Sequence, residues 1–214
     1  TLLNETLGWK EGSLLSEKLV LISDSLSADG SFLLPHFMNF YVKSKQRVVL
    51  VGLEQGLGHY MAISKKLGVN LQQAHSAGQF VYINGVAAPY DWTDAVTTET
   101  NNPATAAMQS IANSHPFSLS TKLSEEQSKD PLESLYRIIE RQLPENDPRS
   151  SVIVIDNLSA LTHAVGEEEV IAFVLYCRSL AEKHSKVHQN SSCVVVLAHA
   201  DVDQLLVASL SHTA

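Results

Sequence analysis

The chain has 214 residues, 44% of them hydrophobic and 18% charged, a balance that suits one globular domain with a sizeable core. Lys and Arg number 15 against 23 Asp and Glu, and the resulting charge of −8 excludes a broad basic surface for nucleic acid. No stretch reaches the roughly 18 apolar residues of a membrane span and no secretory signal opens the chain, so we expect a cytoplasmic or nuclear protein without membrane contact.

Four short runs rich in Val, Ile and Leu predict strands at residues 19–23, 48–53, 151–156 and 193–197. They are continuous rather than alternating, which is typical of strands buried on both faces of a parallel sheet. A fifth run, residues 80–83, predicts another strand, although Asn84-Gly85 behind it could equally close a hairpin.

Apolar residues at helical spacing predict helices within residues 31–43, 57–68, 130–143 and 167–184. Pro35 falls near a first turn, and Gly68 is placed to end its helix. Asp130 is placed as a cap before Pro131 at the first helical position. Strands and helices therefore alternate, which predicts an α/β fold with a central, mostly parallel sheet.

One segment, residues 86–129, interrupts this alternation because it is rich in Thr, Ser and Asn. We expect a surface insertion or a flexible segment there, with one short helix after Pro103, inside a single domain that spans residues 1–214.

Residues 19–37 have the outline of a phosphate-binding loop: a buried strand, a small polar turn and an apolar helix. A working loop, G-x-x-x-x-G-K-[ST], needs glycines, a lysine for the phosphates and a hydroxyl for Mg²⁺. With the second glycine aligned on Gly30, the other three positions hold Ser25, Ser31 and Phe32. Asp29 beside them repels phosphate. We expect a degenerate loop that binds no cofactor; the alternative is a plain strand-to-helix turn in which Gly30 allows close packing.

Two carboxylates follow predicted strands and could serve a nucleotide site. Asp156 stands where such ATPases hold a Mg²⁺-bound water, and Glu54 where they activate the attacking water. Aspartates at strand ends also hydrogen-bond the next turn, and loop glutamates are commonly solvated. Because lysine and Mg²⁺ ligands are lacking, we expect structural roles and no catalytic residue.

The remaining polar clusters predict no further site. His199 and Asp201 are two possible ligands where zinc needs three or four, and His36, His59 and His163 are dispersed, so no metal site is expected. Two basic clusters are expected to be solvated helix ends, with tRNA phosphate contact as the alternative: Lys43, Lys45 and Arg47, and Lys183, His184, Lys186 and His188. Cys177 and Cys193 lie in apolar stretches, which favours free thiols in a reducing compartment.

The stretches "DGSFLLPHFMNFYVK", "GHYMAISKKLGVNL", "VIVIDNLSALT" and "LLVASLSH" resemble the RecA-like core and, more specifically, the Elongator complex protein 6 family. The resemblance runs from Leu19 to His212 and is weak across residues 86–129. It implies a RecA-like P-loop NTPase fold whose phosphate-loop motif is degenerate, in a non-catalytic subunit. No ATP-binding residue is carried over.

The resemblance also implies partners. The family assembles with Elongator complex proteins 4 and 5 into a heterohexameric ring with two copies of each. The ring docks on the remaining Elongator subunits, binds tRNA and supports modification of the wobble uridine, U34, while the acyl-transfer chemistry belongs to another subunit. The alternative is a divergent nucleotide hydrolase in which a neighbour supplies the missing Lys or Arg, with Glu54 and Asp156 as its acids. Exposed apolar surface on the helices within residues 32–41 and 170–181 would indicate the interfaces.

Overall fold

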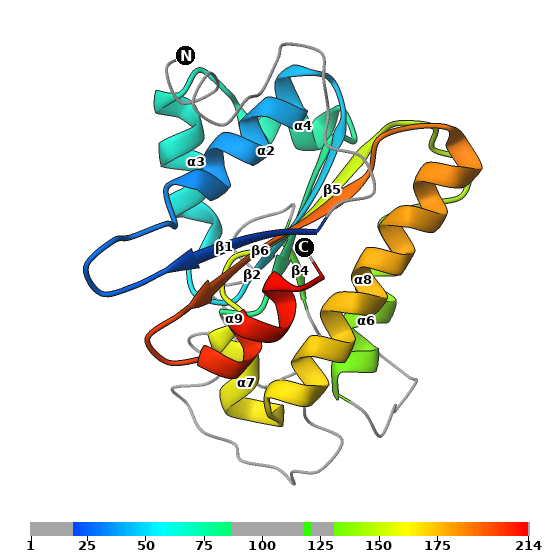
Figure 1. The fold of residues 1–214 in the computed structure, drawn as a ribbon. Helices are drawn as coiled ribbons and strands as arrows, with labels where there is room; N and C mark the ends of the chain where they lie inside the picture. The colour runs from blue at the N-terminus through cyan, green and yellow to red at the C-terminus, as the bar shows by residue number, and fades with distance from the viewer. Residues whose placement is uncertain (1–18, 87–117, 121–130, 214) are drawn as a thin grey trace, which may run out of the picture.

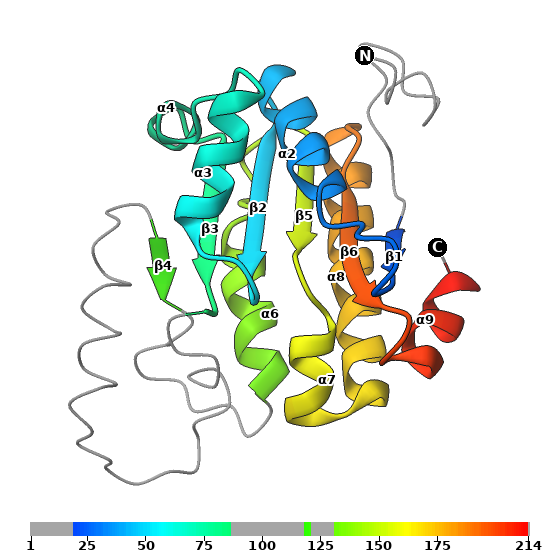
Figure 2. The ribbon, with the colours of Figure 1, turned by 90° about the vertical axis from the view of Figure 1, so that its left-hand side faces the viewer.

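The computed structural model describes residues 19–86, 118–120 and 131–213. Within these residues, six strands form one sheet in the order β1-β6-β5-β2-β3-β4. Every strand pair is parallel, and Figure 2 shows β1 and β4 at the two edges. The strands are β1 (Leu19–Asp24), β2 (Arg47–Gly52), β3 (Phe80–Asn84), β4 (Ser118–Ser120), β5 (Ser151–Ile155) and β6 (Cys193–His199). This confirms the predicted α/β fold with a parallel sheet.

The predicted strands agree with β1, β2, β3, β5 and β6 to within two residues at each end. The hairpin alternative at Asn84-Gly85 is wrong, because β3 runs parallel to both of its neighbours. Its register pairs Val48 with Phe80 and Gly52 with Asn84. The Gly85 N–H then continues the ladder by donating to the Gly52 carbonyl at 2.8 Å.

Helices cover both faces of the sheet, so that two apolar layers enclose it (Figure 1). One layer contains α2 (Leu33–Lys43), α3 (Leu57–Lys66) and α4 (Leu71–Ser76). The other contains α6 (Pro131–Arg141), α7 (Ser159–Val165), α8 (Glu167–His188) and α9 (Gln204–Ser211). Successive strand residues point to opposite layers: Val48 lies in the first and Val49 in the second, and both are fully buried. This explains why the strands are continuously apolar.

The helix boundaries follow local signals in the sequence. Pro35 lies in the first turn of α2, where the missing N–H breaks no helical bond. Gly68 follows α3 with a φ of +79°, and its N–H donates to the Lys65 carbonyl. Helix α6 begins at Pro131, as predicted; Asp130 lies outside the described residues. Helices α4, α7 and α9 were not predicted, and α4 is capped by the Asn70 side chain, which accepts from Gln73 N–H at 3.1 Å.

The segment of residues 86–129 contributes β4, which pairs with β3 and extends the sheet at its edge. The helix expected after Pro103 falls outside the described residues, and the single-domain assignment stays a prediction. Within the described parts of the chain, no helix is long and apolar enough to cross a membrane.

Candidate functional site

The candidate site lies at the carboxyl ends of the strands, where a parallel sheet gathers the loops that bind ligands. Asp24 ends β1, Glu54 follows β2, Asp156 follows β5 and His199 ends β6. The arrowheads of β2, β5 and β6 point the same way in Figure 2, so these side chains share one edge of the sheet.

The turn after β1 occupies the position of the predicted phosphate loop. Ser25 and Ala28 exchange two backbone hydrogen bonds, of 3.1 and 3.0 Å, which close a tight turn. Leu26 is fully exposed at its tip, and the loop projects beyond the sheet in Figure 1. Phe32, at the position of the Mg²⁺ hydroxyl, is 53% exposed and provides no oxygen ligand.

Three carboxylates accept hydrogen bonds from backbone N–H groups of this loop. Asp24 Oδ2 accepts from Gly30 N–H at 3.3 Å, Asp29 Oδ1 from Ser31 N–H at 2.8 Å, and Asp201 Oδ2 from Leu26 N–H at 2.7 Å. The first helical donors, Leu33 and Leu34, are bonded to the carbonyls of Gly30 and Ser31. Backbone N–H groups are what a phosphate loop offers to phosphate oxygens. Here three of these N–H groups are already bonded to carboxylates of the protein itself.

The pKa of Asp29 is held below its usual value by the hydrogen bonds from Ser31, first from its side chain and then from its backbone. Asp29 is therefore a carboxylate at neutral pH and adds negative charge to the loop.

Gly30 packs directly on β1. A Cβ atom at this position would lie 2.8 Å from Ile22 Cγ2 and 3.1 Å from Asp24 Cβ. Real Cβ atoms do not approach carbon this closely without movement of the neighbour. Close packing explains this glycine without a nucleotide, as the plain-turn alternative proposed.

Asp156 is 1% exposed, and protein donors surround both of its oxygens. It accepts hydrogen bonds from the N–H groups of Leu53 (2.6 Å), Glu54 (3.2 Å) and Gln55 (3.0 Å), and from the Tyr60 hydroxyl (2.9 Å). Burial raises the pKa of Asp156 to about 6, and these donors oppose the rise. The side chain fixes the loop between β2 and α3, which supports the structural role.

Glu54 and His199 are linked through Asn157. Its amide nitrogen lies 3.3 Å from Glu54 Oε2 and 3.2 Å from His199 Nε2, while its oxygen accepts from Ser159 N–H at 2.8 Å. The bond from Ser159 fixes the amide orientation, so Nε2 of His199 accepts. The Nδ1–H group then donates to Asp24 Oδ1 at 2.5 Å.

Both nitrogens of His199 are engaged, so neither is available to a substrate. Burial lowers the pKa of His199, but the hydrogen bond and charge of Asp24, with Glu54 and Asp203 nearby, outweigh burial and raise it above its ordinary value. The arrangement holds the imidazole as a structural link between β1 and β6.

Asn157, Ser159 and Asp203 were missed in the sequence. Buried Asp203 accepts from the Ser159 hydroxyl and, at 2.8 Å, from the Thr162 hydroxyl, which ties the start of α9 to α7. Asn157 lies 103 positions from Glu54, and Ser159 lies 44 positions from Asp203, so no local spacing links these pairs. The available signal was the position of Asp203 directly before an apolar helical run.

The dispersed histidines and the pair His199 and Asp201 do not converge. Within residues 19–86, 118–120 and 131–213, no group of three His, Cys, Asp or Glu side chains is arranged to hold a metal ion. His163 Nδ1 lies 2.7 Å from the Ser159 carbonyl, and His36 and His59 stack edge-on against Phe32 and Tyr60.

The first basic cluster is largely engaged with the protein. Arg47 is largely buried at the amino end of β2, donates to the Gly78 carbonyl at 3.1 Å and pairs with Asp147 at 3.4 Å. Lys43 Nζ donates to the Leu67 carbonyl at 2.9 Å, at the end of α3. Lys45 stays exposed in the turn before β2.

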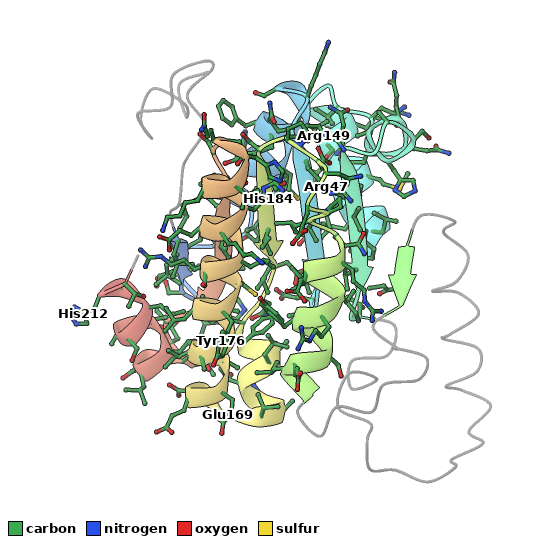
Figure 3. All side chains as sticks on the ribbon, turned by 90° about the vertical axis from the view of Figure 1, so that its right-hand side faces the viewer. Arg47, Arg149, Glu169, Tyr176, His184 and His212 are labelled. Carbon is green, nitrogen blue, oxygen red and sulfur yellow. The ribbon has the colours of Figure 1, made fainter. Side chains whose placement is uncertain are left out.

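In the second cluster, His184 is buried near one end of α8, in the region of Arg47 and Arg149 (Figure 3). Burial lowers the pKa of His184. Lys186 pairs with Glu182 at 2.6 Å, whereas Lys183 is exposed. Lys43, Arg47 and Lys186 are thus bonded to groups of the protein itself, which supports the interpretation as helix ends.

The buried thiols of Cys177 and Cys193 are free, as predicted. Burial raises the pKa of both, to about 12 for Cys193, so neither is a thiolate nucleophile at neutral pH.

Comparison with known proteins gives the family. A family model described as Elongation complex protein 6 matches residues 1–214. The chain is 31% identical over 186 residues to Elongator complex protein 6 of Danio rerio, covering 86% of this chain and 63% of that protein. It is 31% identical over 219 residues to the Xenopus laevis protein (98% and 74%) and 29% identical over 207 residues to the Homo sapiens protein (91% and 69%). The chain thus spans less than two thirds of the Danio relative.

An uncharacterised protein of Pyrococcus horikoshii, solved in complex with an unknown peptide, has a similar fold. The TM-score is 0.64 at 13% identity, over 99% of this chain and 79% of that chain. At this identity the likeness concerns the fold alone. The family match covers the whole chain and agrees with the stretches quoted from the sequence, and the chain therefore belongs to the Elongator complex protein 6 family.

Proposed function

We propose that this chain is a non-catalytic, RecA-like subunit of the Elongator accessory ring. The observation that carries this proposal, beside the family, is the loop after β1, in which three N–H groups are bonded to the carboxylates of Asp24, Asp29 and Asp201. Such a loop keeps the frame of a phosphate-binding loop, but negative charge occupies part of its donor set and it lacks the lysine that would attract phosphate. It is what a subunit that builds a ring without hydrolysing nucleotide would retain.

The partners of this subunit are Elongator complex proteins 4 and 5, with two copies of each of the three proteins in a heterohexamer. The ring docks on the remaining Elongator subunits, binds tRNA and supports modification of its wobble uridine, U34. The acyl-transfer chemistry belongs to another subunit. The protein acts in the cytoplasm, with the nucleus as the alternative compartment, and binds no cofactor.

Light scattering tests the ring assignment. We expect the full-length protein, co-expressed with Elongator complex proteins 4 and 5, to elute with the molar mass of two copies of each chain. A protein that stays monomeric beside both partners would overturn the assignment.

A second candidate function is a nucleotide hydrolase completed in trans. It is favoured by Glu54, which is exposed at the end of β2 and could face a neighbour's Lys or Arg. The clean test is Glu54→Gln, because Asp156→Asn would also disturb the fold. This candidate predicts that Glu54→Gln abolishes ATP turnover by the assembled complex, while Glu145→Gln, at another exposed loop acid, has no effect. Turnover that survives Glu54→Gln would remove the candidate.

A further inference from the structure

A groove of about 510 Å³ runs between α6 and α8, on the opposite helical layer from α2. Leu132 and Phe173, both at least 95% buried, form its floor. Ala172 is exposed in it, and Tyr136 and Tyr176 meet edge-on across it with ring centroids 6.2 Å apart. Figure 3 shows Tyr176 and Glu169 on the part of α8 that lies beside α6.

The groove has exposed apolar surface among the described residues. Tyr176, which lines it, is 65% exposed in the middle of a helix whose inward residues are buried. This matches the expectation that apolar surface within residues 170–181 would mark an interface. Tyrosines that flank an apolar floor are the type of residue that dominates binding energy at protein interfaces.

The rim of the groove is acidic. Arg137 is the basic residue among those lining it, and Glu133 (3.4 Å) and Glu140 (3.1 Å) already pair with it. Glu168 and Glu169 are exposed at the start of α8, and no ion pair between described residues uses them. A partner that seats here must therefore compensate negative charge.

We propose that this groove docks a partner protein through a segment that carries a large apolar side chain flanked by Lys or Arg. The apolar side chain packs over Phe173 beside the contacting pair Tyr136 and Tyr176, and a basic group lies against Glu169. A second copy of this chain is disfavoured, because a twofold contact would bring the acidic rim of one groove against that of the other. The inference goes beyond the proposed function, because it adds a contact site on this chain and the chemical character of the segment that binds there.

The test is site-specific photocrosslinking in the full-length protein, purified from cells in its complete complex. Benzoylphenylalanine replaces Ala172, which is exposed in the groove, and in a matched control it replaces Val187, which is 61% exposed farther along α8. We expect position 172 to crosslink one partner segment at least about fivefold more than position 187 does, because only the groove provides a buried contact. That segment is expected to contain Lys or Arg beside a large apolar residue.

A charge variant gives the second readout. Glu169→Lys is expected to lower the crosslink yield at least about threefold, and Glu145→Lys, at an exposed loop acid away from the groove, to leave it unchanged. Circular dichroism of each variant checks that the fold is kept.

The outcomes separate this inference from the proposed function. If Elongator subunits co-purify but position 172 crosslinks no better than position 187, or only to residues 87–130 of its own chain, the docking inference is overturned and the ring assignment stands. If no Elongator subunit co-purifies, the proposed function fails. The docking inference then survives only when position 172 crosslinks a basic and apolar segment of another protein and Glu169→Lys removes that crosslink.

Discussion

At the scale of single residues, the carboxylates of the candidate site stabilise the fold. Asp156 receives N–H and O–H donors on both oxygens, and Asp24 joins Gly30 to His199. Burial of the Asp156 charge costs free energy, which the hydrogen bonds offset in part, and a buried donor that loses its acceptor costs more.

Asp156→Asn should therefore destabilise the protein strongly. The amide nitrogen would replace one acceptor oxygen, so at least one of the donors from Leu53, Gln55 and Tyr60 would lose its partner. We expect a loss of about 2–3 kcal/mol in the free energy of unfolding, measured by urea titration. The control Asp201→Asn changes an exposed carboxylate with a single backbone donor and should cost less than about 1 kcal/mol. Equal losses in the two variants would contradict this account.

A second residue-scale prediction concerns Asp147, which lies near the amino ends of β2 and β5. Its hydrogen bonds with Arg149, and the charges of Arg149 and Arg47, lower its pKa to about 2. Because the folded-state pKa lies below the ordinary value near 4, its stabilisation is present above pH 4 and is lost as pH falls toward 2. Asp147→Asn should cost about 1–2 kcal/mol at pH 7 in denaturant titrations, after allowance for solvent screening. The difference between the two proteins should shrink steadily below pH 4; a constant difference would exclude a charge effect.

At the scale of helices and strands, the sequence was informative where an element is long. The strands β1, β2, β5 and β6 are mainly unbroken apolar runs, and α2, α3, α6 and α8 repeat their apolar residues over about three turns or more. The hydrophobic period cannot identify α4 or α7, which have six and seven residues and depend on packing against neighbours. Strand β4 was missed because three residues of a Ser- and Thr-rich segment become a strand only by pairing with β3.

The same limit applies to the candidate site. Asp156 and Glu54 were found because each follows an apolar run that predicts a strand. The pairing of Asp24 with His199, and of Leu26 with Asp201, joins residues 175 positions apart, and only the parallel neighbours β1 and β6 bring them together.

The end of α8 allows an element-scale test of direct tRNA contact. Lys186 is paired with Glu182, and the neighbouring His184 is buried, so we interpret this cluster as a helix end. Reversal of Lys183 and Lys186 to Glu should leave the tRNA affinity of the assembled ring within about twofold and its salt dependence unchanged. Lys65→Glu, at an exposed lysine of α3, is the control. A salt slope that falls by about one or two in the double variant alone would establish phosphate contact.

At the scale of the whole molecule, the described residues form two apolar layers around a parallel sheet whose carboxyl edge is rich in acids. The overall charge of −8 has the same sign as this edge. The overall charge therefore does not attract an anionic nucleotide. The bonded N–H groups of the loop after β1 disfavour its binding as well.

Thermal unfolding of the whole protein provides a direct check. A ligand that binds only the folded state and is present at a concentration of a thousand times its Kd adds about 4 kcal/mol to the free energy of unfolding. Such a gain would raise Tm by several degrees. We expect no shift of Tm with millimolar Mg-ATP compared with the same concentration of Mg²⁺ alone. A reproducible rise specific to ATP would contradict the proposal that the loop is closed to phosphate.

The loop after β1 has one more consequence. In a ring driven by nucleotide hydrolysis, each subunit changes conformation when the bound triphosphate is hydrolysed to diphosphate. The conformation of the assembly then depends on the ATP level of the cell. A loop whose N–H groups are bonded to carboxylates of the same chain, Asp24, Asp29 and Asp201, does not alternate between a nucleotide-bound and a nucleotide-free state. This subunit would present the same surface to its neighbours in a starved cell and in a growing one.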